Sequence, residues 1–377
     1  MSRSQIVRIE WARLEGQRPR AAGCNARLGE HGQRVAPPIA RITLNSDASG
    51  FGWSRVTEAQ ARELVGRSIE DDMDPLQGIP DPLRALEYPI YDLIGKRAHK
   101  PVYALLGGQC DADQKYRVPC YDTSLYMDDL HLPDDSAAAR LIASEAIEDH
   151  ERGHRNFKLK VGRGAMHMPL EAGTRRDISV IRAVRQAVGA RAQIMIDANN
   201  GYNVNLVKRV LGETADARLH WIEEAFHEDA RLYGHLQEWL DREGIETLIA
   251  DGEGSASPHL LDWARQGMID VVQYDVRRPG FSRWLALGPQ LDAAGVRSAP
   301  HNYGDPYGNY VSCHLAAVIR RFESVEWDEA AVPGLDASAY SVVEGNVHVP
   351  DLPGFGLDLD DDVYARAVQE NGFTVSG

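Results

Sequence analysis

The middle of the chain carries short apolar runs, each of which ends at or near one charged residue. Seven runs have the length and composition of β-strands: Phe157–Lys160, Ile194–Asp197, Trp221–Glu223, Thr247–Glu253, Val271–Asp275, Val296–His301 and Ser324–Glu326. The charged residues that close them lie 22 to 37 residues apart, which is about one strand, one loop and one helix. This period predicts a (β/α) barrel.

In such a barrel the C-terminal ends of all the strands meet at one mouth. The seven closing residues would therefore bring one lysine, one histidine and five carboxylates into a single pocket. Titratable groups gathered in one pocket are typical of an enzyme active site.

The pattern before the barrel is different, with strand, long loop, strand and then helices. Strands are expected over Ile6–Leu14 and Ile39–Leu44, and helices over Val56–Ile69 and Leu83–Lys96. Residues 15–38 read as a loop, and a loop of that length inside a compact domain is usually disordered or a functional lid. We therefore expect an α+β domain over 1–115, the barrel over 116–335, and a segment 336–377 that packs back on the first domain.

Composition limits the partners and the compartment. The net charge of −15 disfavours nucleic acid, although a divalent cation and pocket lysines can still favour an anionic substrate. No apolar run approaches the ~20 residues that span a bilayer, and the N-terminus shows no targeting pattern. Four well-separated cysteines, Cys24, Cys110, Cys120 and Cys313, are expected to be reduced. A cytoplasmic enzyme without nucleic-acid or membrane partners is the simplest interpretation.

Asp197, Glu223 and Glu253 close three consecutive strands and are the candidate metal ligands. Three carboxylates in one mouth repel one another unless a cation lies between them, and an all-oxygen set favours a hard ion such as Mg²⁺. Two positions stay open at this stage. Glu224 is adjacent to Glu223 and would point the opposite way, whereas Asp251 shares a strand face with Glu253.

The candidate acids and bases lie on either side of these ligands. Lys158 and Lys160 share one face of a strand, and two neighbouring ammonium groups lower each other's pKa, which can free one lysine as a base. Asp275 and His301 close neighbouring strands, so the carboxylate can fix the tautomer of the ring and raise its basicity.

Several motifs together resemble the enolase superfamily and, within it, the mandelate racemase subgroup. They are EYPIYDLIGKRAHKPVYALLGG before the barrel, KLK, DAN, WIEE, GEG, DVRRPGFS, SAPH and the tail VPDLPGFGLDL. The WIEE and GEG matches favour Glu223 over Glu224 and Glu253 over Asp251. Ala225 stands where the family usually has proline, and Pro279-Gly280 where it usually has two glycines.

The resemblance implies a barrel with a capping domain, one Mg²⁺ per subunit, and removal of the proton beside a carboxylate through an ene-diolate. Lys160 and His301 would act from opposite faces, and Glu326 would hydrogen-bond the substrate carboxylate. No lysine follows Lys208, which disfavours the relatives that carry a second lysine where this chain has Asp275.

We therefore predict a lyase that dehydrates an acid sugar. A racemase or epimerase of a 2-hydroxy acid is the alternative, and a non-catalytic ligand-binding relative is a third hypothesis. The substrate is expected to be a small carboxylate, and the protein a homo-oligomer.

Substrate contacts are the last expectation. Asn199, Asn25 and Arg20 are candidates, because Asn199 follows the first ligand strand and the others lie in the long first loop. That loop holds or borders Arg18, Arg20, Arg27 and Arg34, and arginine suits bidentate binding of a carboxylate. A diacid or a long polyhydroxy acid would then be favoured.

Overall fold

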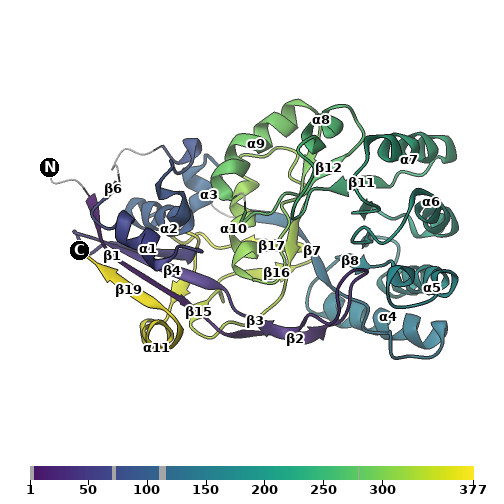
Figure 1. The fold of residues 1–377 in the computed structure, drawn as a ribbon, viewed down its shortest axis with the longest axis horizontal. Helices are drawn as coiled ribbons and strands as arrows, with labels where there is room; N and C mark the ends of the chain where they lie inside the picture. The colour runs from purple at the N-terminus through teal and green to yellow at the C-terminus, as the bar shows by residue number, and fades with distance from the viewer. Residues whose placement is uncertain (1–3, 70–73, 110–115, 279) are drawn as a thin grey trace.

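The computed structural model describes residues 4–69, 74–109, 116–278 and 280–377. The molecule is elongated, with a sheet built from both chain termini at one end and the barrel at the other (Figure 1). Among the described residues, no helix is long and apolar enough to cross a membrane.

Eight parallel strands of the described chain form the barrel. They are β7 (Tyr116–Leu125), β8 (Asn156–Lys160), β9 (Gln193–Asp197), β10 (Trp221–Glu223), β11 (Leu248–Asp251), β12 (Val271–Val272), β13 (Arg297–Ser298) and β14 (Val325–Trp327). Each pairs with the next from β7 to β13, and β14 pairs with β7. A parallel bridge from Ser298 to Phe322 closes the circle. The predicted barrel is confirmed.

Helices follow the first seven of these strands and cover the outside of the barrel. They are α4 (Asp135–Glu151), α5 (Leu170–Val188), α6 (Val204–Glu213), α7 (Ala230–Glu243), α8 (Leu260–Arg265), α9 (Phe281–Ala293) and α10 (Tyr307–Leu315). The helix α5 buries Ile178, Ile181 and Val184, which at this spacing form one apolar stripe. Asp134, Asn203 and Asp229 cap α4, α6 and α7 through their side chains.

The barrel interior has an apolar layer below the charged mouth. It consists of Tyr121, Met195, Trp221, Ala250, Val271 and Ala299, all at most 1% exposed. Side chains two residues further along a strand point the same way, so the residues that follow this layer on β9 and β10 are Asp197 and Glu223. The apolar layer therefore supports the charged residues from below.

The N-terminal sheet has the order β19–β1–β4–β5, with β6 also on β1. Its strands are β1 (Ser4–Arg13), β4 (Pro38–Leu44), β5 (Ser49–Trp53), β6 (Ser68–Ile69) and β19 (Phe373–Ser376). Four helices contact this sheet or one another: α1 (Glu58–Leu64), α2 (Glu87–Ala98), α3 (Val102–Leu105) and α11 (Asp361–Asn371). The first three come from the N-terminal part of the chain, and α11 comes from the C-terminal part. The last strand pairs antiparallel with the first, so the tail packs back on the N-terminal sheet.

The C-terminal segment also reaches the barrel. Its strand β17 (Asn346–Val349) pairs antiparallel with the start of β7 and with β16 (Ser341–Val343). A further small ladder joins β15 (Leu335–Asp336) to β18 (Asp358–Leu359). Short 3₁₀ turns occupy Pro75–Gln77, Leu83–Leu86, Arg163–Ala165 and Ala215–Ala217.

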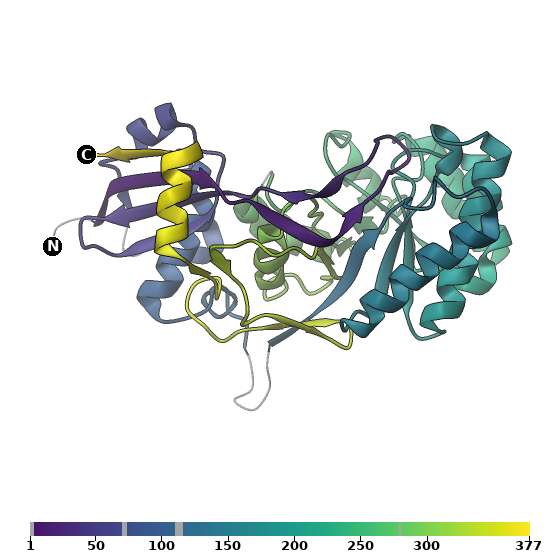
Figure 2. The same ribbon diagram turned by 90° about the horizontal axis from the view of Figure 1, so that it is seen from below.

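Residues 15–38 are not an irregular loop, so that expectation is wrong. They form an antiparallel hairpin of β2 (Gly16–Ala22) and β3 (Gly32–Val35), which runs from the N-terminal sheet to the barrel (Figure 2). Gly, Pro and Arg interrupt any apolar alternation over these residues, so the local pattern does not predict the two strands. Cys24, Cys120 and Cys313 are free thiols, as predicted, and Cys110 lies outside the described residues.

Candidate active site

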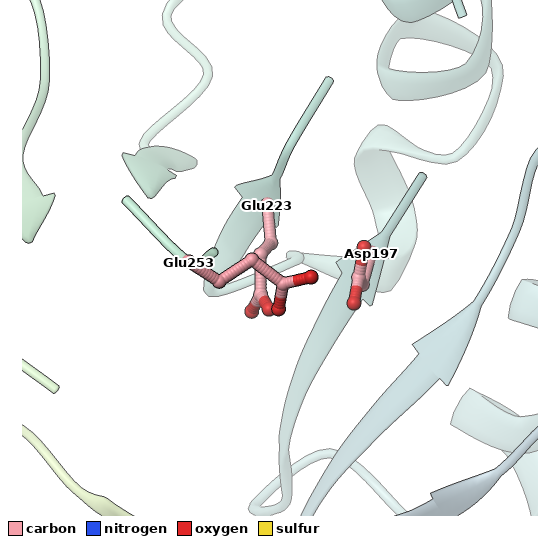
Figure 3. A group of neighbouring side chains, drawn as sticks. All are labelled: Asp197, Glu223 and Glu253. Carbon is pink, nitrogen blue, oxygen red and sulfur yellow. The ribbon is translucent and has the colours of Figure 1, made fainter. Parts of the chain in front are cut away.

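Asp197, Glu223 and Glu253 converge at the ends of three adjacent strands (Figure 3). Each offers one carboxylate oxygen, and these oxygens lie within 4.8 Å of one another. Asp197 and Glu223 are almost fully buried, at 0% and 1% exposure. The three residues predicted from the strand period are therefore brought together.

The choice between Glu223 and Glu224 follows from the strand pleat. Glu223 points into the barrel, where Lys158, Trp221 and Gln273 bind its two oxygens at 2.7, 3.1 and 2.9 Å. Glu224 has a positive φ of 41° and accepts hydrogen bonds from the side chains of Asn199 and Asn200 instead. Glu223 is thus the one that faces the interior.

The choice between Asp251 and Glu253 depends on a bend that the alternation rule does not include. Asp251 ends β11 and turns outward, where it accepts from the Tyr233 hydroxyl and from the Gly252 amide. Gly252 has a φ of 129°, a conformation that only glycine adopts readily. The strand stops alternating at this point, so Asp251 and Glu253 do not share a face and Glu253 alone reaches the mouth.

Lys158 and Lys160 both point into the barrel, as predicted. Lys158 Nζ lies 2.7 Å from Glu223, 2.8 Å from Glu326 and 3.7 Å from Asp197. Lys160 Nζ forms an ion pair with Asp197. Burial lowers the pKa of Lys160, and Lys158 lowers it too, but the carboxylates of Asp197, Glu253 and Glu223 together outweigh them and the pKa is raised. The ion pair with Asp197 therefore opposes the lowering of the pKa that two neighbouring ammonium groups predict.

His301 lies across the mouth from the lysines. Its Nδ1 is 2.6 Å from Asp275 Oδ1, and its Nε2 is 3.1 Å from Glu253 and 3.8 Å from Glu326. An isolated parallel bridge joins Asp275 to His301 beyond the ends of β12 and β13. Burial lowers the pKa of His301, but the carboxylates of Glu253, Glu326 and Asp275 raise it to about 10. The predicted His–Asp pair is present.

The mouth holds more acids than bases, and the pKa values respond to that surplus. Burial raises the pKa of Glu223 to about 7, with Lys158 opposing and Asp197 adding to the rise. Burial likewise raises the pKa of Glu224 to about 9, and Glu253 adds to it. Burial and the repulsion between the carboxylates both disfavour the ionised cluster, and a bound cation would offset both effects.

A hard divalent cation fits this donor set. All the donor atoms are oxygens, they converge on one space, and their surplus negative charge is what a bound cation would neutralise. Asn199 adds a buried side-chain oxygen that has no hydrogen-bond partner among the described residues. The residues present therefore suit Mg²⁺ better than a softer ion that prefers sulfur or imidazole.

The other predicted contact residues have more varied positions. The backbone amide of Asn199 donates to Asp197 Oδ1 at 2.8 Å, so this residue braces a candidate ligand. Asn25 caps the hairpin tip through the amides of Arg27 and Leu28. The guanidinium of Arg20 is engaged by Ser124 and Asp149 at 2.8 and 3.1 Å, behind β7 and beside α4. Arg20 is therefore held by side chains of β7 and α4.

Some residues of the site were not predicted. Gln273 and Trp221 hydrogen-bond Glu223, and Thr123 donates to Glu326 at 2.7 Å. Strand alternation could have indicated two of them. Trp221 lies two positions before Glu223 and Gln273 lies two positions before Asp275, so each would share the inward face of its strand.

The chain combines an eight-stranded β/α barrel with a second sheet that is built from both chain ends. Carboxylates close three successive barrel strands, and a candidate base lies on either side of them. This combination defines an enolase-type enzyme. The chain belongs to the enolase superfamily: residues 142–363 match the family described as Enolase C-terminal domain-like. The membership predicted from the motifs is confirmed.

Solved structures of high similarity come from Geobacillus. A mandelate racemase/muconate lactonizing protein from Geobacillus sp. Y412MC10, complexed with magnesium and tartrate, is 47% identical with a TM-score of 0.96, over 100% of this chain and 98% of that one. A galacturonate dehydratase from Geobacillus sp., complexed with D-galacturonate and 5-keto-4-deoxy-D-galacturonate, is 47% identical with a TM-score of 0.95 over 100% of both chains.

A more distant relative belongs to the same group of activities. An arabinonate dehydratase from Saccharolobus solfataricus is 26% identical over 287 residues, which cover 73% of this chain and 69% of the relative. The two Geobacillus structures, in contrast, match this chain over its whole length.

Proposed function

We propose that the chain is a Mg²⁺-dependent dehydratase of a sugar acid, and that its substrate is a hexuronate such as D-galacturonate. The observation that carries the proposal is the carboxylate trio with Lys160 on one side and the His301–Asp275 pair on the other. The galacturonate dehydratase that is 47% identical supports the substrate.

Asp197, Glu223 and Glu253 would hold the cation. When bound, Mg²⁺ would stabilise negative charge that develops on the substrate carboxylate as the neighbouring proton leaves. Lys158 is fully buried and binds Glu223 and Glu326 at once, so it fixes the positions of two carboxylates on opposite sides of the mouth.

Lys160 and His301 are placed to exchange protons with the substrate from two sides. One of them removes the proton from the carbon beside the carboxylate, and the electron pair of that C–H bond forms a double bond to the next carbon. The hydroxyl on that next carbon leaves with a proton from the opposite base as water, and the resulting enol becomes a ketone. Asp275 holds the His301 ring through Nδ1, which leaves Nε2 facing the mouth.

Glu326 would complete the recognition of the substrate carboxylate. Burial raises its pKa, but Lys158 and His301 lower it to about 2, so it is ionised. Thr123 and the Asn302 amide donate to its two oxygens at 2.7 and 2.9 Å. These bonds fix the side chain at the mouth.

The reaction suits a uronate. Loss of the proton beside the carboxylate and of the hydroxyl on the following carbon converts D-galacturonate into its 5-keto-4-deoxy product, which is the pair of compounds bound by the Geobacillus enzyme. A racemase or epimerase would use the same two bases to return the proton to the other face, without loss of water.

The test is to incubate the purified protein with Mg²⁺ and a panel of uronates, aldonates and 2-hydroxy acids, and to follow the products by proton NMR. A 2-keto-3-deoxy pattern relative to the carboxylate, abolished by a chelator and restored by Mg²⁺, would support the dehydratase. Inverted 2-hydroxy acids without keto product would favour the racemase. A protein that binds these acids but turns over none of them would favour the non-catalytic relative.

Three further expectations belong to the same proposal. They are a homo-oligomer, a cytoplasmic location, and domain limits near residues 115 and 335. Light scattering, cell fractionation and limited proteolysis test them in turn.

A further inference from the structure

Three aromatic side chains form a wall beside Lys160, and we call His31, Tyr126 and Tyr303 the aromatic wall. The ring centroids of His31 lie 4.9 Å from Tyr126 and 5.6 Å from Tyr303, and those of the two tyrosines are 5.2 Å apart. Lys160 Nζ lies 5.3 Å from the Tyr126 centroid. The hairpin supplies His31, and the barrel supplies both tyrosines.

The wall stands across the mouth from the carboxylate trio. Tyr126 follows β7 and Tyr303 follows β13. Of the trio, Asp197 and Glu223 end β9 and β10, and Glu253 follows β11. In the circular strand order, β13, β14 and β7 lie opposite β10. A substrate whose carboxylate lies at the trio, with the next carbon between Lys160 and His301, extends its remaining carbons toward the wall.

The arginines of the hairpin do not supply a positive charge there. Arg18 forms a bidentate pair with Asp328 at 2.8 and 2.9 Å, and Arg34 pairs with Glu15 at 2.7 Å. Arg20 is held by acids of α4. The Arg27 guanidinium donates to the carbonyls of Asn199 and Asn200, which follow β9 on the trio's side.

Arg18 serves the wall in a different way. Its guanidinium carbon lies 4.7 Å from the centroid of the Tyr303 ring, while Asp328 neutralises its charge and also accepts from the Gly304 amide at 2.8 Å. Arg18 therefore fixes the ring and the loop that carries it. It does not leave a free cation for a substrate anion.

His31 is a neutral hydrogen-bonding group. Its Nδ1 lies 2.9 Å from the carbonyl oxygen of Gly23, so Nδ1 carries the proton and Nε2 is left as an acceptor. Burial lowers the pKa of His31, and the positive charges of Lys160 and Arg18 lower it further. The ring accordingly offers an acceptor for a hydroxyl, and it offers no cation.

We propose that the aromatic wall is the subsite for the distal end of the substrate, and that it selects an uncharged, hydroxyl-bearing end over a second carboxylate. The inference rests on the proposed dehydratase function and narrows its substrate class to monoacids. It also replaces the expectation of a diacid. The cations beside the wall, Arg18 and Lys160, are each paired with an aspartate, so a second carboxylate there would lose its water without gaining an unpaired cation.

The matched pair of substrates is D-galacturonate and galactarate, which have the same hydroxyl configuration and differ only in the oxidation of the distal carbon. We expect kcat/KM to be at least about 100-fold higher for galacturonate, because the distal carboxylate of galactarate would be buried without a charge partner. Equal or better turnover of galactarate would overturn the proposal. Tartrate, which accompanies magnesium in one neighbour, ends two carbons earlier and does not reach the distinguishing position.

Variants of the hairpin sharpen the test. His31→Arg should raise the galactarate-to-galacturonate ratio of kcat/KM by about tenfold or more, because it adds the missing cation. His31→Leu should lower kcat/KM for galacturonate by about tenfold through loss of the acceptor. Arg34→Ala, whose side chain is 78% exposed, is the matched control in the same hairpin and should change neither value. A ratio that stays constant in all three variants would contradict the assigned role of His31.

Failure of the inference and failure of the proposed function give different results. Dehydration of both acids at similar rates would support the proposed dehydratase activity and contradict the selectivity assigned to the aromatic wall. If neither acid is dehydrated, the proposed function falls, and calorimetry of the Mg²⁺-loaded protein with both acids decides the inference. Tighter binding of galacturonate would support the wall, and equal or tighter binding of galactarate would reject it.

Discussion

Two buried charge clusters lie next to each other along β8, and they differ in their charge balance. In the first, Arg163 and Arg176 face Asp129 and Asp177, with Arg163 bound to Asp177 at 2.7 Å and paired with Asp129. The second is the mouth cluster, in which Lys158 and Lys160 face four carboxylates, those of Asp197, Glu223, Glu253 and Glu326.

The difference distinguishes a structural cluster from a cation site. In the first cluster the two arginines match the two fully buried aspartates, and Arg176 also binds the partly exposed Asp135 at 3.0 Å. Tyr202 and the Gly162 amide both donate to the remaining oxygen of Asp177, Oδ2. In the mouth cluster, acids exceed lysines by two even with the His301–Asp275 pair set aside. A balanced cluster leaves no buried charge without a partner, whereas the surplus negative charge of the mouth cluster suits a divalent ion.

The largest expected effect comes from removing a candidate ligand from the mouth cluster. Asp197→Asn, Glu223→Gln or Glu253→Gln should lower kcat/KM by about 10³-fold or more, because each weakens the site that would stabilise several kcal/mol of developing charge. The fold should persist, since a surplus negative charge is removed. Activity assays with Mg²⁺ titration and circular dichroism check this. Asp251→Asn is the control, and full activity in Glu253→Gln with loss in Asp251→Asn would reverse the ligand assignment.

The bases on the two sides should be separable. Lys160→Ala and His301→Asn should each lower dehydration by about 10²- to 10⁴-fold, yet exchange of the α-proton with deuterium should persist in one of them, as followed by NMR. Asp275→Asn should behave as a milder His301 variant, because it disturbs the tautomer and leaves the ring in place. Exchange lost in both single variants would contradict bases on opposite faces.

Breaking the balanced cluster should affect stability first. Arg163→Leu leaves Asp129 and Asp177 buried without their main partner, and we expect unfolding to become easier by about 3–5 kcal/mol. Chemical unfolding followed by fluorescence measures this. Arg209→Ala removes a pair at the surface and should leave the unfolding midpoint unchanged. An Arg163→Leu protein as stable as the wild type would mean that the aspartates are neutral in the fold.

The smallest effect concerns two buried histidines that form no ion pair within the described part of the chain. Burial lowers the pKa of His314 to about 3 and that of His154 to about 4, in contrast to His301. Because the unfolded imidazoles bind protons near pH 6.5, the stability present above that pH should be lost as the pH falls toward 4. Each histidine adds about 1.4 kcal/mol per pH unit to this slope. His314→Leu should reduce the slope in unfolding curves between pH 6.5 and 4, and a slope equal to that of the wild type would contradict the buried neutral ring.

Much of the barrel could be predicted from the sequence because each strand is a short apolar run with one polar residue at its end. β8, β9, β10 and β14 match the predicted strands within a residue at each end. The strands β12 and β13 are shorter than predicted, and Asp275 and His301 lie beyond them, joined by a single bridge. Asp275 and His301 still reach the mouth from the loops that follow these strands. The positions of the two residues were therefore predicted correctly although the strand ends were not.

The sequence by itself determined which residue types reach the mouth, because the strand–helix period and the side-chain alternation are local properties. Tertiary structure decided the rest. The bend at Gly252 puts Glu253 and Asp251 on different faces, which strand alternation alone does not give, and the carboxylates around Lys160 reverse the direction of its pKa shift. The hairpin directed Arg18 and Arg20 to acids on distant elements and brought His31 to the mouth instead. These outcomes depend on contacts between segments up to 310 residues apart, which no local pattern encodes.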